Sequence, residues 1–128
     1  MSTPNDRKFL QTHEWHKQSG DLVEIGITLF AADELTDVTY VALPKVGTVL
    51  KAGGKFGEIE SVKATSDMYC GISGTVVEIN DGLNNDPGTV NRDPYVAGWM
   101  IRVKPTGDLT AEMAGLLDTP AYLKATGH

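Results

Sequence analysis

The stretch GEIESVKATSDMYCGISG, residues 57–74, holds one cation among acidic, small and apolar residues. Lys63 is that cation, and Glu58, Glu60 and Asp67 are the acidic residues around it. Such a lysine is a solvated strand charge, an ion-pair partner, a nucleophile or a handle for an attached group. A nucleophilic lysine needs a desolvating pocket, whereas acidic neighbours favour the charged amine. The composition of the stretch therefore disfavours a reactive lysine.

The local structure of this stretch is ambiguous from its residues. Residues 62–64 include no Gly, Pro, Asn or Asp, the residue types that tight turns usually require. Periodicity alone makes residues 59–68 one long strand, and turn chemistry does not place Lys63 at the tip of a hairpin. Both possibilities stay open at this level.

Short alternating runs lie on both sides of the stretch, between frequent glycine turns. Apolar residues alternate with others in residues 23–27, 75–79 and 100–104. A period of two with β-branched residues predicts half-buried strands. Many short strands separated by glycine turns predict a sandwich or a barrel.

Helical signals are few and lie mostly at the C-terminal end. Thr28 is expected to cap a short helix in residues 28–37. Thr119 is expected to cap a final helix with Pro120 at its first position. Between strands and final helix, Asp108 is expected to cap a helix with one apolar face, formed by Leu109, Met113, Leu116 and Leu117. The sequence thus predicts one β-rich domain with a small helical cap.

Length and charge limit the possible classes of protein. The chain has 128 residues, of which 41% are hydrophobic and 22% charged, so we expect a single globular domain. The net charge of -6 disfavours nucleic acid or an anionic membrane as partner, because both demand clustered Lys and Arg. No apolar run approaches the length of a membrane span.

Cysteine and histidine usage disfavours disulfides and metals. Cys70 is the single cysteine, and His13 and His16 lack further nearby ligands, so no metal site is expected. Residues 1–10 have no apolar core of a signal peptide. We therefore expect a cytoplasmic protein, or a mitochondrial matrix protein if this is a mature eukaryotic chain.

Several motifs together resemble one known family, the glycine cleavage system H proteins. Residues 60–64, ESVKA, resemble the family's lipoylation segment, and Ser66-Asp67 and Ile72-Ser73-Gly74 follow it as in the family. HEW at 13–15 resembles its N-terminal motif, and VNRDPYVAGWMIRVKP resembles the segment that contains its last strand. The likeness runs roughly from residue 7 to residue 123. It implies a single carrier domain over residues 7–128, with residues 1–6 as a flexible N-terminus.

The chain departs from the family pattern at three places. Leu29–Ala32 stand where many members have Asp-Tyr-Ala-Gln, Cys70-Gly71 where many have Ser-Pro, and Val96 where a glycine is common. None of these positions is Lys63. The departures therefore concern the partner surface more than the carrier role.

The resemblance implies a mainly β fold and a non-catalytic carrier function. The fold is two antiparallel sheets packed face to face, a lipoyl/biotinyl-like barrel-sandwich hybrid with short helices and a C-terminal helical cap. Lipoate is joined to Lys63 at an exposed hairpin. It takes an aminomethyl group from the glycine decarboxylase (P protein) to the aminomethyltransferase (T protein). Dihydrolipoyl dehydrogenase (L protein) then reoxidises it.

The resemblance also implies roles for five further residues. Glu60 and Gly74 are expected to be recognised by the lipoate-attaching enzymes, although Gly74 also suits a turn. Glu14, Asp67 and Thr12 are expected to form a cleft that holds the loaded arm, the alternative for the two carboxylates being simple solvation. No catalytic or metal-binding residue is implied.

Two tryptophans and the cysteine are assigned structural roles. We expect Trp15 and Trp99 to be core aromatics, and Cys70 to be a small buried hydrophobe that is not a redox partner.

Other functions remain open for the same residues. An H-protein-like lipoate-binding protein of another pathway, such as sulfur oxidation, shares the lysine handle and differs in its partner surface. A lipoyl or biotinyl domain of a large acyltransferase or carboxylase is disfavoured, because Val62 precedes Lys63 and the flanking segments are long. A structural interaction domain without cofactor is the last alternative.

Overall fold

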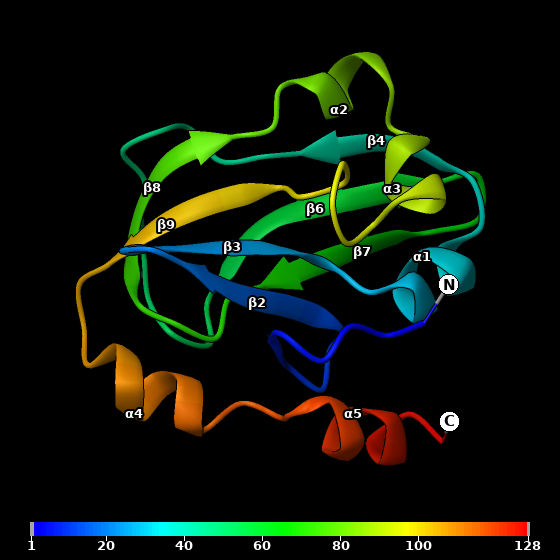
Figure 1. The fold of residues 1–128 in the computed structure, drawn as a ribbon. Helices are drawn as coiled ribbons and strands as arrows, with labels where there is room; N and C mark the ends of the chain where they lie inside the picture. Colours follow the sequence, from blue (N-terminus) through cyan, green and yellow to red (C-terminus); the bar gives the residue numbers. More distant parts are fainter. Residues whose placement is uncertain (1, 128) are drawn as a thin grey trace.

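Two antiparallel sheets form the framework of the computed structural model, which describes residues 2–127 (Figure 1). The six-stranded sheet has the order β1-β2-β3-β9-β8-β5, and the three-stranded sheet has the order β4-β6-β7. The predicted class, mainly β with two antiparallel sheets, is confirmed. The strands are β1 (Lys8–Phe9), β2 (Glu14–Ser19), β3 (Leu22–Ile27), β4 (Val38–Ala42), β5 (Val49–Leu50), β6 (Lys55–Ser61), β7 (Thr65–Tyr69), β8 (Gly74–Ile79) and β9 (Ile101–Pro105).

Within residues 2–127, five short helices connect and flank the strands. Thr28 caps α1 as predicted, and its hydroxyl accepts the N–H of Ala31. The C-terminal helices α4 and α5 follow β9 and lie outside the two sheets (Figure 1). The helices are α1 (Leu29–Leu35), α2 (Gly82–Asn85), α3 (Thr89–Arg92), α4 (Leu109–Ala114) and α5 (Thr119–Ala125).

Two details of the C-terminal helices differ from the prediction. Asp108 caps α4 as expected, but the helix ends at Ala114, so Leu116 and Leu117 lie beyond it. Leu117 instead exchanges two backbone hydrogen bonds with Phe9, each 2.8 Å long. Strand pairing with the N-terminal segment therefore replaces the last predicted helical turn.

The cap of α5 lies one residue earlier than predicted. The Asp118 carboxylate accepts the N–H of Ala121 at 2.9 Å. Thr119 is the first helical residue, and its hydroxyl donates to the carbonyl of Pro4 at 2.7 Å. The predicted Thr119 cap is therefore wrong, because an aspartate directly before it takes the capping role.

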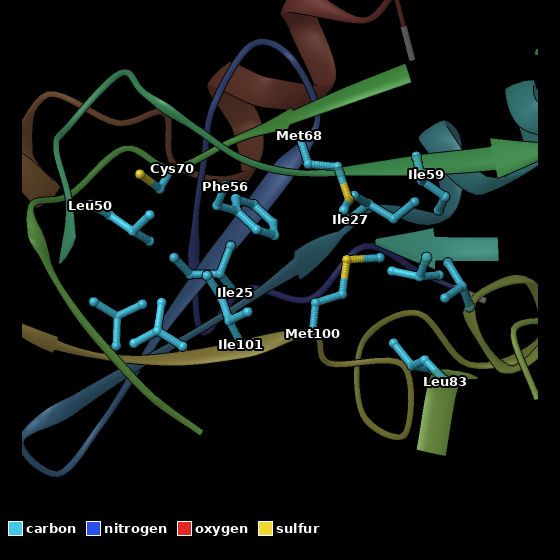
Figure 2. Close-up of a cluster of buried hydrophobic side chains, with 14 of the residues drawn as sticks. Ile25, Ile27, Leu50, Phe56, Ile59, Met68, Cys70, Leu83, Met100 and Ile101 are labelled. Atoms are coloured by element: carbon cyan, nitrogen blue, oxygen red, sulfur yellow. The ribbon is translucent and has the colours of Figure 1, made fainter. Parts of the chain in front are cut away.

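The main core lies between the two sheets (Figure 2). Ile25 and Ile101 of the large sheet pack in one cluster with Ile59 and Met68 of the small sheet. A second cluster forms around Trp15, which is fully buried as predicted. Its other buried members are Phe9, Tyr95 and Tyr122. The sheets are thus joined by apolar packing, with the C-terminal helix contributing to the second cluster.

Trp99 only partly matches the prediction of a core aromatic. It is half-buried and packs against the second cluster. The guanidinium of Arg102 lies 3.8 Å from the centre of its ring. Its indole therefore packs on one side and meets a surface cation on the other.

The strands β6 and β7 form a hairpin, so the alternative of one long strand is wrong. The Ser61 N–H donates to the Ala64 carbonyl at 2.8 Å. The Ser61 hydroxyl oxygen accepts the N–H groups of Lys63 at 3.1 Å and Ala64 at 3.0 Å. Val62 and Lys63 keep negative φ angles, so no glycine or asparagine is required. A serine side chain thus supplies the turn that the usual residue types do not.

Strand β7 lies at the edge of the small sheet, and two side chains of β2 bond to its end. The Glu14 carboxylate accepts the N–H of Tyr69 at 2.7 Å. The His16 Nε2 accepts the N–H of Gly71 at 2.8 Å. Because residues two apart on a strand share a face, β2 presents both acceptors to the same segment. These bonds join the two sheets at the base of the hairpin.

Candidate functional site

Lys63 is exposed at the tip of the β6–β7 hairpin and contacts the C-terminal end of α1. Figure 1 shows this hairpin next to the connection from α1 to β4. Its Nζ donates to the carbonyl of Glu34 at 3.2 Å. The N–H of Val62 donates to the carbonyl of Asp37 at 3.1 Å, which fixes the tip against the α1–β4 connection. The lysine amine is therefore accessible, while the backbone that carries it is held.

A cavity of about 150 Å³ lies close to this lysine. Its walls come from the start of β2, from α1 and from the small sheet, and Glu34 is among the lining residues. The apolar lining residues are Ile27, Ala31, Leu35, Ile59 and Met68. Thr12, Glu14 and Asp67, which the family resemblance assigned to one cleft, all line this cavity. We call it the cleft.

Glu14 is the buried carboxylate of the cleft. It is 1% exposed, and it accepts the hydroxyl of Thr12 at 2.5 Å as well as the N–H of Tyr69. Burial raises the pKa of Glu14 to about 7, although both hydrogen bonds act in the opposite direction. Glu14 is therefore a sheltered group that changes charge near neutral pH.

Asp67 lies at the outer side of the cleft and already has a cationic partner. Its carboxylate is 46% exposed and lies 3.1 Å from Lys55 Nζ, which also contacts Glu58 at 2.5 Å. Two carboxylates thus share one cation on the outer face of the small sheet. An exposed ion pair of this kind contributes only about 0–1 kcal/mol.

Glu60 and Gly74 have different environments. Glu60 is exposed on β6, three residues before Lys63, and pairs across the sheet with Tyr40, which is 50% exposed. Gly74 is buried and is the first residue of β8, so it lies in a strand and not in the turn that was the alternative explanation for this glycine. A Cβ there would lie 2.4 Å from a Val103 methyl carbon and 2.5 Å from the Lys104 carbonyl oxygen. Close approach of β9 is a sufficient reason for this glycine.

Cys70 is a buried small side chain, as predicted. Its thiol donates to the carbonyls of Lys51 at 3.3 Å and Gly54 at 3.5 Å. Burial raises the pKa of the Cys70 thiol, which keeps it protonated and poorly nucleophilic.

His16 is a buried residue whose role the sequence did not reveal. Its Nε2 accepts from Gly71, so the neutral ring carries its proton on Nδ1. Burial lowers the pKa of His16 to about 4, since the charged ring is disfavoured away from water. The available signal was its spacing of two from Glu14, which predicts a shared face.

Two general features of the described chain bear on other functions. Within residues 2–127, no group of three or more His, Cys, Asp and Glu side chains is placed to hold a metal ion. No helix of that same range is both long enough and apolar enough to cross a membrane.

Comparison with known proteins points to one family. The family model described as Glycine cleavage H-protein matches residues 7–128. The glycine cleavage system H protein of Myxococcus xanthus is 45% identical over 119 residues, covering 93% of this chain and 91% of that protein. The probable glycine cleavage system H protein of Haloarcula marismortui is 48% identical over 122 residues, covering 95% of this chain and 94% of that protein.

A solved structure agrees with these sequence relatives. The crystal structure of a glycine cleavage system H protein from Mycobacterium marinum superposes with a TM-score of 0.89 at 38% identity. The match covers 98% of this chain and 100% of that one. The chain belongs to the glycine cleavage H-protein family, whose members are lipoyl carriers.

Proposed function

We propose that this chain is the lipoyl carrier of glycine cleavage, with lipoate joined by an amide to Lys63. The observation that carries the proposal is the pairing of an exposed lysine on a fixed hairpin tip with a sheltered, partly apolar cleft beside it. When attached, the lipoyl group would supply a disulfide: its S–S bond breaks as one sulfur takes the aminomethyl group and the other becomes a thiol, and removal of that group leaves the attached arm as a dithiol. The family of the chain supports this chemistry.

The hairpin is suited to be the mount of such a group. The tip is fixed by the Ser61 bonds and by the bond from Val62 to Asp37, while the side chain of Lys63 adds four methylenes with rotatable bonds. A flexible stem on a rigid mount raises the effective concentration of the attached group at each docked partner.

The cleft fits the chemistry of the cargo and its stem. Its apolar lining suits a hydrocarbon stem, and Glu14 offers a carboxylate to the cationic amine of an aminomethyl group. A protonated amine has no free lone pair to expel the sulfur, so an adjacent carboxylate protects it against loss of ammonia. Such a bond contributes about 1.5–3 kcal/mol in a sheltered site. Glu14 therefore acts mainly as the holder of this amine, with Thr12 as its hydrogen-bond donor.

Asp67 is expected to assist Glu14 only weakly. Its carboxylate is half exposed and already shares Lys55 with Glu58. Solvent screening leaves an exposed carboxylate little net attraction for a second cation. Asp67 thus belongs to the entrance of the cleft.

The lipoate-attaching enzymes must recognise the apo form of this hairpin. Glu60 and Tyr40 lie side by side on the exposed face that leads to Lys63, and Val62 at the tip is 70% exposed. We propose Glu60 as the charged recognition element. Gly74 is buried against the neighbouring strand β9. Its role in lipoylation is therefore indirect: the missing side chain lets β8 and β9 approach closely, and the glycine does not touch the attaching enzyme.

The partners of the carrier supply the catalysis. We propose that the chain receives the aminomethyl group at the P protein, delivers it to the T protein and is reoxidised by the L protein. The protein itself contributes position and shelter and is not an enzyme. We expect it in the cytoplasm with these partners.

Reconstitution with purified partners tests the proposal. The lipoylated chain, P protein and glycine should give a mass increase for the aminomethyl group, and T protein with tetrahydrofolate should remove it. The Lys51→Arg variant is the control for loss of a lysine elsewhere: Lys51 is exposed and lies outside the hairpin, so this variant should be loaded and unloaded like the wild type. A lipoylated chain that P protein cannot load would overturn glycine cleavage and favour another lipoate-dependent pathway.

A further inference from the structure

A tyrosine of the C-terminal helix joins two of the three walls of the cleft, the one at the start of β2 and the one formed by α1. The Tyr122 hydroxyl lies 2.8 Å from His13 Nδ1 and 2.7 Å from the Thr28 hydroxyl oxygen. These partners are 109 and 94 residues away in the sequence. One is on the β2 side of the cleft and the other is the cap of α1.

The first wall includes a residue in a disfavoured conformation. His13 has a φ of 86°, in the left-handed region that non-glycine residues rarely adopt. Such a conformation persists only where its surroundings hold it. Here the ring bonds to Tyr122 and lies 4.7 Å from the ring of Phe30. His13 lines the cleft, and Glu14 directly follows it.

The second wall is α1, which begins at Thr28. The Thr28 hydroxyl accepts the N–H of Ala31 at 3.2 Å, and Ala31 lines the cleft. At the other end of the same helix, the Glu34 carbonyl accepts Lys63 Nζ. The backbone N–H of Thr28 donates to the His13 carbonyl at 2.9 Å, so the two walls also meet directly.

The two hydroxyl groups form a continuous hydrogen-bonded chain from α1 to His13. The Ala31 N–H donates to the Thr28 hydroxyl, which is hydrogen-bonded to the Tyr122 hydroxyl, and the Tyr122 hydroxyl is hydrogen-bonded to His13 Nδ1. Tyr122 is 1% exposed and its ring stacks on Phe9 at 4.6 Å, so the core fixes where its hydroxyl lies. Burial raises the pKa of Tyr122 to about 12, and the hydroxyl therefore keeps its proton.

We propose that Tyr122 is a positioning residue of the cleft. Its hydroxyl holds the His13 wall and the α1 wall at one spacing, and this spacing determines how well Glu14 shelters bound cargo. The inference rests on the proposed carrier function of the cleft. The C-terminal helix then helps to protect the cargo, although it does not contain the lysine that carries the cargo.

The Tyr122→Phe variant tests the proposal, because it keeps the stacked ring and removes only the hydroxyl. Thr119→Val is the matched control: it removes a buried hydroxyl of the same helix, which bonds to Pro4 and not to the cleft. In the apo proteins, Tyr122→Phe should shift the His13 imidazole ¹⁵N resonances and speed hydrogen exchange of the Thr28 amide. Thr119→Val should change neither.

The loaded proteins provide the second measurement. Tyr122→Phe removes both hydrogen bonds of the hydroxyl, and loss of one buried hydrogen bond corresponds to roughly a two- to tenfold effect, so ammonia release from this variant should be faster by at least about twofold. Ammonia release from Thr119→Val should be as fast as from the wild type. Once the proteins are unfolded in urea, all variants should release ammonia at the wild-type rate. Glu14→Gln serves as the benchmark for a damaged cleft.

The outcomes separate the two proposals. Faster release in Glu14→Gln with wild-type release in Tyr122→Phe overturns the role of Tyr122 and leaves the cleft intact. Wild-type release in both variants overturns the arm-holding cleft itself. Equal acceleration in Tyr122→Phe and Thr119→Val means general loosening and also rejects the inference. Should Tyr122→Phe not fold, Thr28→Val breaks the same chain at its other end, with Thr28→Ser as the variant that retains the hydroxyl.

Discussion

The backbone N–H of Tyr69 donates to the carboxylate of Glu14 across 2.7 Å, and this bond ties the edge of the small sheet to the large one. The same carboxylate lines the cleft beside Lys63. Glu14 therefore has a structural task and a proposed binding task. Glutamine retains an acceptor for the N–H and loses the charge, whereas alanine loses both.

The buried Glu14 makes stability depend on pH. Its pKa is about 7 in the folded chain and 4.5 in a free side chain, so the folded chain binds more protons between these values. This contribution to stability is complete below about pH 4.5 and is lost as the pH rises through 7. Its upper limit is about 3 kcal/mol.

Two Glu14 variants should separate charge from hydrogen bonding in urea unfolding at pH 5 and pH 8. Glu14→Gln should gain free energy of unfolding relative to the wild type at pH 8. Glu14→Ala should be less stable than Glu14→Gln at both pH values by about 1–3 kcal/mol, because the Tyr69 N–H loses its acceptor. Parallel pH curves for wild type and Glu14→Gln would contradict the shifted pKa.

His16 should make stability depend on pH in the opposite direction to Glu14. Its pKa is lowered to about 4, so the unfolded chain binds more protons between pH 6.5 and 4, and stability falls as the pH drops through that range. Glu14→Gln should expose this slope, since it removes the opposing contribution. Imidazole NMR provides the direct check, with a neutral His16 ring expected at pH 5. A midpoint near 6.5 would mean that the ring is hydrated.

The hairpin turn should depend on one hydroxyl. Ser61→Ala removes the acceptor for the N–H groups of Lys63 and Ala64, and it should cost about 0.5–1.5 kcal/mol of stability. It should also slow lipoylation, because the tip becomes mobile. Ser66→Ala, on the same hairpin but outside the turn, is the control. Unchanged stability and lipoylation in Ser61→Ala would show that the backbone alone fixes the turn.

Lys63 should be the only site of lipoate attachment. Lys63→Arg keeps a charge and cannot form the amide in the ordinary way, so it should fold and retain its unmodified mass after expression with lipoate. Intact mass spectrometry measures this directly. Modification that persists at Lys51 or Lys55 would reject the assignment.

Gly74 should be intolerant of a side chain for steric reasons. Gly74→Ala places a methyl group against Val103 and the Lys104 carbonyl, which we expect to cost about 1–3 kcal/mol. Gly115→Ala is a fair control, since a Cβ added there would lie 3.5 Å from its nearest neighbour, the Glu112 carbonyl oxygen. Thermal unfolding compares the two. Lost lipoylation with wild-type stability in Gly74→Ala would instead indicate direct recognition.

The sequence predicted those features that depend on local pattern. Alternation located β3, β8 and β9, and a threonine followed by apolar residues located α1. The hairpin escaped prediction from propensity because its turn depends on the Ser61 side chain, a residue type that is common in many other settings. Family resemblance placed the hairpin where the local pattern did not.

Features that depend on tertiary contact were beyond the sequence. The burial of Glu14 and His16 follows from their bonds to Tyr69 and Gly71, some 55 residues away in each case. The pairing of Asp67 with Lys55 requires the β6–β7 register. Such long-range partners leave no periodic signal, and for this reason the role of Tyr122 is visible only in three dimensions.

The β2 side chains that bond to the end of β7 also occupy N–H groups at the open edge of the small sheet. An exposed strand edge is a template on which a second chain can add a strand. Any intruding strand at the base of this hairpin would have to displace a buried carboxylate and a buried imidazole from Tyr69 and Gly71. The hairpin can therefore be exposed at its tip without offering this end of the strand edge to another copy of the chain.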